Sequence, residues 1–138
     1  MHKPQSPRRL LGRRGEEMAA AHLCRKGYAI IAANWRCARG ELDLVARDRA
    51  TLVFVEVRTR RTTLAGSAAE SITLAKQRRL ARLARAYLER VELDGQAWSG
   101  PWRIDVVAIE LPAHGAARIV HLVSAIEELE DEHYDNYT

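Results

Sequence analysis

Residues 40–60 read GELDLVARDRATLVFVEVRTR, and this stretch decides the fold. It contains two apolar segments, residues 41–47 and residues 51–58, joined by the polar tripeptide Asp48-Arg49-Ala50. The second segment is rich in β-branched residues and is the strongest strand signal in the chain. Because the connection is short, the two segments predict a β-hairpin.

Outward from this hairpin, the pattern predicts two helices and three more strands. One helix is expected from about residue 12 to Lys26, where Gly27 ends it. A longer helix is expected from about residue 69 to Val91, because apolar side chains recur there at helical spacing. The further elements are strands at residues 28–33, 102–109 and 118–123, and a basic turn at residues 34–40.

The order of these elements is helix, three strands, helix, two strands, which indicates a single α/β domain. We expect residues 1–11 to form a disordered basic arm, residues 12–124 the domain, and residues 125–138 an acidic tail. The chain has 138 residues, of which 47% are apolar and 29% charged, as in an ordinary globular protein.

The sequence contains no run of 18 apolar residues, so it predicts no membrane-spanning helix. The first residues also lack the apolar stretch of a signal peptide. We therefore expect a cytoplasmic protein. Cys24 and Cys37 show no CxxC spacing, which argues against a zinc site or a disulfide framework.

Charge is unevenly distributed along the chain. The net charge of +4 divides into +10 over residues 1–105 and −6 over residues 106–138. A basic surface attracts polyanions such as nucleic acid. A solvated, arginine-rich surface is the alternative, and charge alone does not choose between the two.

A carboxylate lies in the most hydrophobic segment of the sequence. Side chains alternate along a strand, so Glu56 shares a face with Leu52 and Phe54. A carboxylate in such surroundings is costly unless it is paired with a cation.

The preceding strand shows the same feature, with Leu42 and Leu44 expected on one face and Glu41 and Asp43 on the other. Glu16 falls on the apolar stripe of the first helix. Clustered carboxylates suit Mg²⁺ or Mn²⁺, which can bind a phosphate and activate water. The alternative is neutralisation by nearby guanidinium groups, for which the candidates are Arg58 and Arg103 beside Glu56, and Arg47 and Arg60 beside Asp43.

Several short motifs follow one another in a recognisable order. They are Gly12-x-x-Gly15-Glu16-x-x-Ala19, Gly27-Tyr28, Asn34-x-Arg36, Gly40-Glu41-Leu42-Asp43-Leu44, Phe54-Val55-Glu56-Val57-Arg58-x-Arg60, Lys76 and Arg103-Ile104-Asp105-Val106-Val107. On these motifs the chain resembles, over about residues 10–124, the bacterial YraN family (uncharacterised protein family 0102). That family looks like a branch of the restriction-endonuclease-like superfamily and is similar to archaeal Holliday-junction resolvases. The resemblance implies a central mixed β-sheet flanked by helices.

The resemblance also implies a site. The nuclease signature of the superfamily is an acidic residue, a gap, and then Glu/Asp-x-Lys on the next strand. By similarity, Asp43, Glu56 and the main-chain carbonyl of Val57 would hold Mg²⁺ or Mn²⁺. Glu16 would correspond to an extra carboxylate on the first helix, and Glu41 is given a supporting role only.

One residue departs from this signature, because Arg58 stands in place of the lysine. Arginine stays protonated, so it can grip a phosphate but cannot serve as a general base. Activation of the water would then depend on the metal or on Lys76. The competing reading of Lys76 is an ordinary solvated residue of the second helix.

Basic residues near the expected site are candidates for phosphate contacts. The candidates are Arg36, Arg39, Arg60, Arg61, Lys76, Arg78, Arg82 and Arg85. A solvated helix face is the alternative for those on the second helix. Trp35 is expected either to stack on an unpaired base or to pack in the core.

We therefore expect a metal-dependent DNA endonuclease, or a resolvase-like nuclease, that cuts phosphodiester bonds of branched or single-stranded DNA. Its catalytic residues would be Glu16, Asp43, Glu56 and Arg58, and the analogy with resolvases suggests a homodimer. The alternative is a catalytically inactive nucleic-acid-binding protein with the same fold, which Arg58 favours. A third hypothesis is an adaptor that docks other proteins through its acidic residues 127–135.

Overall fold

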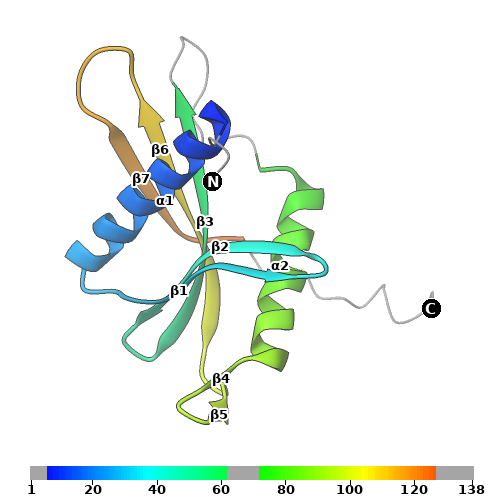
Figure 1. Ribbon diagram of the computed structural model, residues 1–138. Helices are drawn as coiled ribbons and strands as arrows, with labels where there is room; N and C mark the ends of the chain where they lie inside the picture. Colours follow the sequence, from blue (N-terminus) through cyan, green and yellow to red (C-terminus); the bar gives the residue numbers. More distant parts are fainter. Residues whose placement is uncertain (1–5, 62–71, 127–138) are drawn as a thin grey trace, which may run out of the picture.

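Two helices and a five-stranded sheet form the body of the molecule in the computed structural model, which describes residues 6–61 and 72–126 (Figure 1). The expected order α-β-β-β-α-β-β is confirmed, with one short hairpin added between α2 and β6. The elements are α1 (Pro7–Arg25), β1 (Ala29–Cys37), β2 (Gly40–Asp48), β3 (Thr51–Arg61), α2 (Leu74–Arg90), β4 (Glu92–Leu93), β5 (Gln96–Ala97), β6 (Trp102–Leu111) and β7 (Arg118–Ile126).

The strand order in the large sheet is β1-β2-β3-β6-β7. Strands β3 and β6 are parallel, and the other neighbours are antiparallel. The sheet is therefore mixed, because α2 and the short hairpin carry the chain from β3 to its parallel neighbour. This arrangement confirms the expected fold class and is consistent with a nuclease-like fold.

The helices cover opposite faces of the sheet, as the alternation along β3 requires. Leu52 and Phe54 belong to the apolar cluster that contains the buried residues of α2. Val53 and Val55 belong to the cluster that contains Ala19 and other residues of α1. No helix in the part of the chain that the structure describes is long and apolar enough to cross a membrane.

Helix α1 begins at Pro7 rather than near residue 12. The Ser6 hydroxyl accepts a hydrogen bond of 3.3 Å from the main-chain N–H of Arg9, and Pro7 has the backbone angle that a first helical position favours. Residues 7–11 are thus helical rather than part of an arm. Residues 1–5 and the acidic residues 127–135 lie outside the described residues.

Helix α2 begins at Leu74, later than expected, after Thr73 caps it by accepting a hydrogen bond from the N–H of Lys76. Residues 62–71, which include the expected start of this helix, lie outside the described residues.

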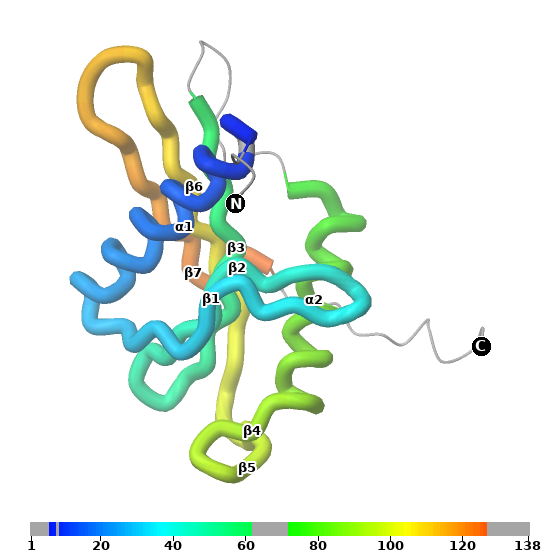
Figure 2. Tube along the Cα trace, in the orientation of Figure 1, coloured from blue at the N-terminus to red at the C-terminus, as the bar shows by residue number. Residues whose placement is uncertain are grey.

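The hairpin of β1 and β2 is longer and more twisted than the sequence pattern indicates. Residues 34–37, expected as a turn, continue β1. Leu42 packs with the cluster on the α2 side, whereas Leu44 packs with the cluster on the α1 side. The expectation that these two leucines share a face is therefore wrong. A two-stranded ribbon twists strongly, and Figure 2 shows this one crossing in front of α2.

Candidate metal centre

The site begins where β2 separates from β3. The two strands are paired from Asp48↔Thr51 up to Leu44↔Val55 and no further in the described register. Just beyond that point, the main-chain N–H of Val57 donates to Asp43 Oδ2 over 2.8 Å. Beyond Leu44 and Val55 the two strands separate, and this point is called the fork below. The Asp43 side chain bridges the fork through its hydrogen bond to Val57 and lies against Glu56.

Four carboxylates gather around this fork. Glu16 on α1, with Glu41 and Asp43 on β2, offers oxygen atoms that all lie within 4.8 Å of one another. Glu56 is adjacent to Asp43, and its side chain is only 8% exposed. Helix α1 and the β2–β3 hairpin thus bring carboxylates to one point.

Burial and mutual repulsion raise the pKa of two of these carboxyl groups. Desolvation and the charge of Glu56 raise the pKa of Asp43 to about 8, against the effect of the Val57 N–H. Burial also raises the pKa of Glu16, to which the charges of Glu41 and Glu56 contribute. The raised pKa values reflect repulsion among these carboxyl groups, which a bound cation would relieve.

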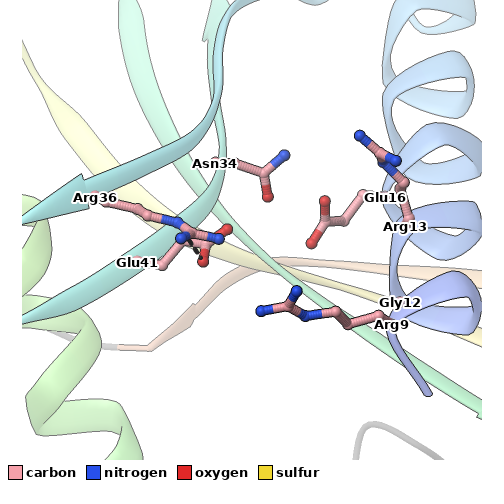
Figure 3. A pocket seen from close by; sticks show the side chains of 7 residues that line it. All are labelled: Arg9, Gly12, Arg13, Glu16, Asn34, Arg36 and Glu41. Carbon is pink, nitrogen blue, oxygen red and sulfur yellow. Dashed lines mark ion pairs between the residues drawn. The ribbon is translucent and has the colours of Figure 1, made fainter. Parts of the chain in front are cut away.

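Asn34 joins the helix carboxylate to the strand carboxylate. It stands opposite Asp43 in the register of β1 and β2, and its φ of 55° lies in the left-handed region that asparagine tolerates. With the amide turned so that its nitrogen faces the carboxylates, it donates to Glu41 Oε1 over 2.6 Å and to Glu16 Oε2 over 2.9 Å. Figure 3 shows the Asn34 side chain between the two acids.

A glycine lets α1 approach the sheet closely enough to deliver Glu16. A Cβ atom on Gly15 would overlap the hydroxyl of Thr59 on β3 and lie 2.9 Å from its Cβ. The Thr59 hydroxyl is buried and has no hydrogen-bond partner among the described groups. Any side chain at position 15 would therefore move the helix, and Glu16 with it.

Arginines border the acidic cluster. A cavity of about 540 Å³ is lined by Arg9 and Arg13 of α1, Arg36 of β1, and the acids Glu16 and Glu41 (Figure 3). A second hollow of about 400 Å³ surrounds the hairpin turn at residues 36–41. An anion entering the cavity would meet guanidinium groups beside the carboxylates.

Lys76 is part of the site rather than a solvated helix residue. Its Nζ lies 2.8 Å from Glu56 Oε1, and its side chain is 27% exposed. The guanidinium of Arg103, one candidate partner for Glu56, instead pairs with Asp48 and Asp105. Arg58 is half-buried on β3, two residues beyond Glu56.

The other predicted nucleic-acid contacts are dispersed. Arg39 lines the hollow at the hairpin turn beside Arg36. The remaining residues line neither of the two cavities: Arg60 and Arg61 end β3, Arg78 is exposed on α2, and Arg82 and Arg85 are half-buried there.

Trp35 belongs to the core and is not a free stacking platform. Its ring packs edge-to-face on Tyr87 of α2, with centroids 5.2 Å apart. Of the two readings of this residue, the structure supports the core one.

Sequence reasoning missed several members of the site. Glu41 is a full member of the cluster, and Asn34, Arg9 and Arg13 contribute to its surroundings. The motifs containing Asn34 and Glu41 were the available signal. Arg9 was not predicted because residues 1–11 were interpreted as an arm rather than as the first turns of α1, and nothing in the sequence pattern distinguished Arg13.

The donor set fits a hard divalent cation. Glu16, Glu41, Asp43 and Glu56 offer carboxylate oxygens, which Mg²⁺ and Mn²⁺ prefer. No histidine or cysteine takes part in the described cluster, so its chemistry does not suit zinc.

Comparison with known proteins places this chain in a family. The model of the uncharacterised protein family UPF0102 matches residues 15–109. A UPF0102 protein of Herpetosiphon aurantiacus is 52% identical over 114 residues, covering 83% of this chain and 91% of the relative. Another, from Geobacter sulfurreducens, is 48% identical over 120 residues, covering 86% of this chain and 90% of the relative. The chain therefore belongs to the uncharacterised protein family UPF0102, the YraN family that its motifs indicate.

Proposed function

We propose that this protein is a divalent-metal-dependent nuclease that hydrolyses phosphodiester bonds in DNA. The observation that carries the proposal is the half-buried Asp43 carboxylate, set against the buried Glu56 and within reach of Glu16 and Glu41. Four carboxylates face two ion-paired cations here, Lys76 at Glu56 and Arg36 at Glu41, so the cluster suits a divalent cation, and its arginine border suits a phosphate.

The chain's own residues have separate roles in this proposal. Asp43 and Glu56 hold the metal, and Glu16 supplies a further oxygen from α1. Asn34 keeps Glu16 and Glu41 at a fixed separation. Bound Mg²⁺ or Mn²⁺ would polarise the phosphate and lower the pKa of a water molecule.

Arginine side chains position the substrate. Arg13 and Arg36 line the cavity beside the carboxylates, where their guanidinium groups can bind phosphate oxygens in pairs. Arg58, on the strand of Glu56, would stabilise the negative charge that develops on the phosphate during cleavage. Contacts of this kind go to the DNA phosphates rather than to the bases. The protein would therefore recognise DNA by its structure, such as branched or single-stranded forms.

A branched DNA has two strands to cut, so a second copy of the chain is proposed to supply the second site. The protein would act in the cytoplasm, where the chromosome lies.

Cleavage assays test this proposal directly. The purified protein should cut at least one member of a panel of four-way junctions, flaps, nicked duplexes and single strands with Mg²⁺ or Mn²⁺. Asp43→Asn and Glu56→Gln should abolish cutting while the circular dichroism spectrum stays unchanged. Glu17→Gln, on the exposed side of α1, is the matched control and should cut normally. No cutting of any substrate with either metal overturns the proposal.

The replacement of the signature lysine by Arg58 favours a second candidate, a DNA-binding protein without catalytic activity. Calorimetry separates the two. The nuclease should bind Mn²⁺ with heat that disappears in Asp43→Asn, whereas a purely binding protein should retain DNA affinity and show no such heat.

A further inference from the structure

Lys76 holds one of the proposed metal ligands in the metal-free protein. Its ammonium group lies 2.8 Å from Glu56 Oε1, where the carboxylate is 8% exposed and next to Asp43. An unpaired carboxylate there would be strongly destabilising. Lys76 thus occupies the place at Glu56 that a cation must take.

The surroundings of Lys76 make this contact exchangeable. Lys76 lies in the first turn of α2, and its side chain is 27% exposed, so it can turn outward without unpacking the buried face of the helix. A long, flexible side chain with a single ammonium group adapts readily to a new anion. The cavity beside the cluster is where a phosphate would arrive under the proposed function.

We propose that Lys76 is an internal counter-ion that divalent metal displaces from Glu56, which frees its ammonium group to bind a phosphate of the DNA. This inference rests on the proposed function. It makes DNA binding by Lys76 conditional on metal, so that the protein holds DNA most tightly when it is ready to cut.

Metal affinity provides the first test, which does not depend on activity. Titration calorimetry with Mn²⁺ alone should show that Lys76→Met binds the metal at least about threefold more tightly than the wild type, since the metal no longer competes with an ammonium group. Arg79→Met removes the same charge one turn along α2 from an exposed position, and it should change the affinity far less.

DNA binding provides the second test. Fluorescence anisotropy with a labelled four-way junction is measured in EDTA and in saturating Ca²⁺, which takes oxygen ligands as Mg²⁺ does. Lys76→Met should bind as the wild type does in EDTA but at least about threefold more weakly in Ca²⁺, the loss expected for one phosphate contact. Arg79→Met should have the same effect in both conditions.

The outcomes separate the two proposals. Absence of Mn²⁺ binding by the wild type overturns the proposed function. If the wild type binds Mn²⁺ but Lys76→Met does not bind it more tightly, or loses DNA affinity equally with and without metal, only the role of Lys76 is overturned. Lys76→Gln, which can still donate a hydrogen bond to Glu56, takes the place of Lys76→Met if thermal unfolding shows that the methionine variant does not fold.

Discussion

Two aspartates of the large sheet, Asp105 and the half-buried Asp43, have opposite surroundings. Asp105 on β6 is fully buried, yet both of its oxygens have partners. Oδ1 accepts from Arg103 Nε over 3.0 Å and from the Ser124 N–H over 2.9 Å, and Oδ2 lies 2.8 Å from His121 Nε2. Asp43 accepts one main-chain hydrogen bond and otherwise faces carboxylates.

Asp105 is neutralised by groups of the fold, whereas Asp43 lies among like charges that the proposed metal would neutralise. The partners of Asp105 come from its own sheet, so the network is complete within the fold. It extends through Arg103 to Asp48 and Tyr28, and through His121 to Lys26 Nζ. Around Asp43 the fold concentrates like charges, which lowers stability without a cation. Asp105 shows that a buried carboxylate need not mark a ligand site, and the proposed metal site rests instead on the gathering of carboxylates around Asp43.

The largest expected effect comes from breaking the completed network. Asp105→Ala removes the nearer of the two carboxylates paired with Arg103 and the acceptor of the Ser124 N–H, and it should lower the free energy of unfolding by about 3–5 kcal/mol. Urea unfolding measures the change. Glu17→Ala, at an exposed position, should change it by less than about 0.5 kcal/mol. A loss at Asp105 no larger than this control would contradict the structural role.

The next effect concerns the approach of α1 that delivers Glu16. Gly15→Ala should lower the free energy of unfolding by about 1–3 kcal/mol, because its methyl group would overlap Thr59. It should also weaken Mn²⁺ binding. Gly12→Ala, with nothing within 4 Å of the added Cβ, should instead stabilise the helix by up to about 1 kcal/mol. Equal effects of the two substitutions would exclude a close contact at Gly15.

Removing the charge of Asp43 should raise the stability of the fold, whereas Asp105→Ala should lower it. The pKa of Asp43 is raised from 3.8 to about 8 in the folded protein. Its protonation therefore contributes stability that is complete below pH 3.8 and is lost as the pH rises to about 8. Metal-free Asp43→Asn should lack this loss and therefore be more stable than the wild type at pH 9.

Urea unfolding of the wild type and Asp43→Asn, between pH 5 and 9 without metal, checks this prediction. The asparagine oxygen can still accept from the Val57 N–H, so the comparison isolates the charge. Parallel profiles of stability against pH for the two proteins would show that the pKa of Asp43 is not raised by its neighbours.

The smallest effect distinguishes the arginines of the cavity from those elsewhere. Arg13→Gln should weaken DNA binding about equally for all sequences and reduce the slope of log affinity against log salt by about one. Arg25→Gln, exposed at the other end of α1, is the control. Anisotropy titrations at several salt concentrations measure both, and equal losses would remove the cavity as the phosphate site.

The local sequence pattern was enough to predict the two helices, the five strands of the large sheet and their order, but not the short β4–β5 hairpin. Alternation along β3 placed Glu56 on the face toward α2, and the apolar stripe of α2 set its buried side. These signals are local, because the repeats of a strand and a helix are written into a few consecutive residues. The family motifs then indicated that Asp43, Glu56 and Glu16 belong together.

Only the tertiary structure decided what surrounds those acids. The fork at Val55 and the left-handed backbone of Asn34 depend on how neighbouring strands pair, and the contact of Gly15 with Thr59 joins elements far apart in the chain. The ion pair between Lys76 of α2 and Glu56 of β3 also joins two separate elements. The sequence contains no periodic pattern that predicts which charged groups of distant elements will pair. The pairing is set by the distances between side chains after the sheet has twisted and the helices have packed.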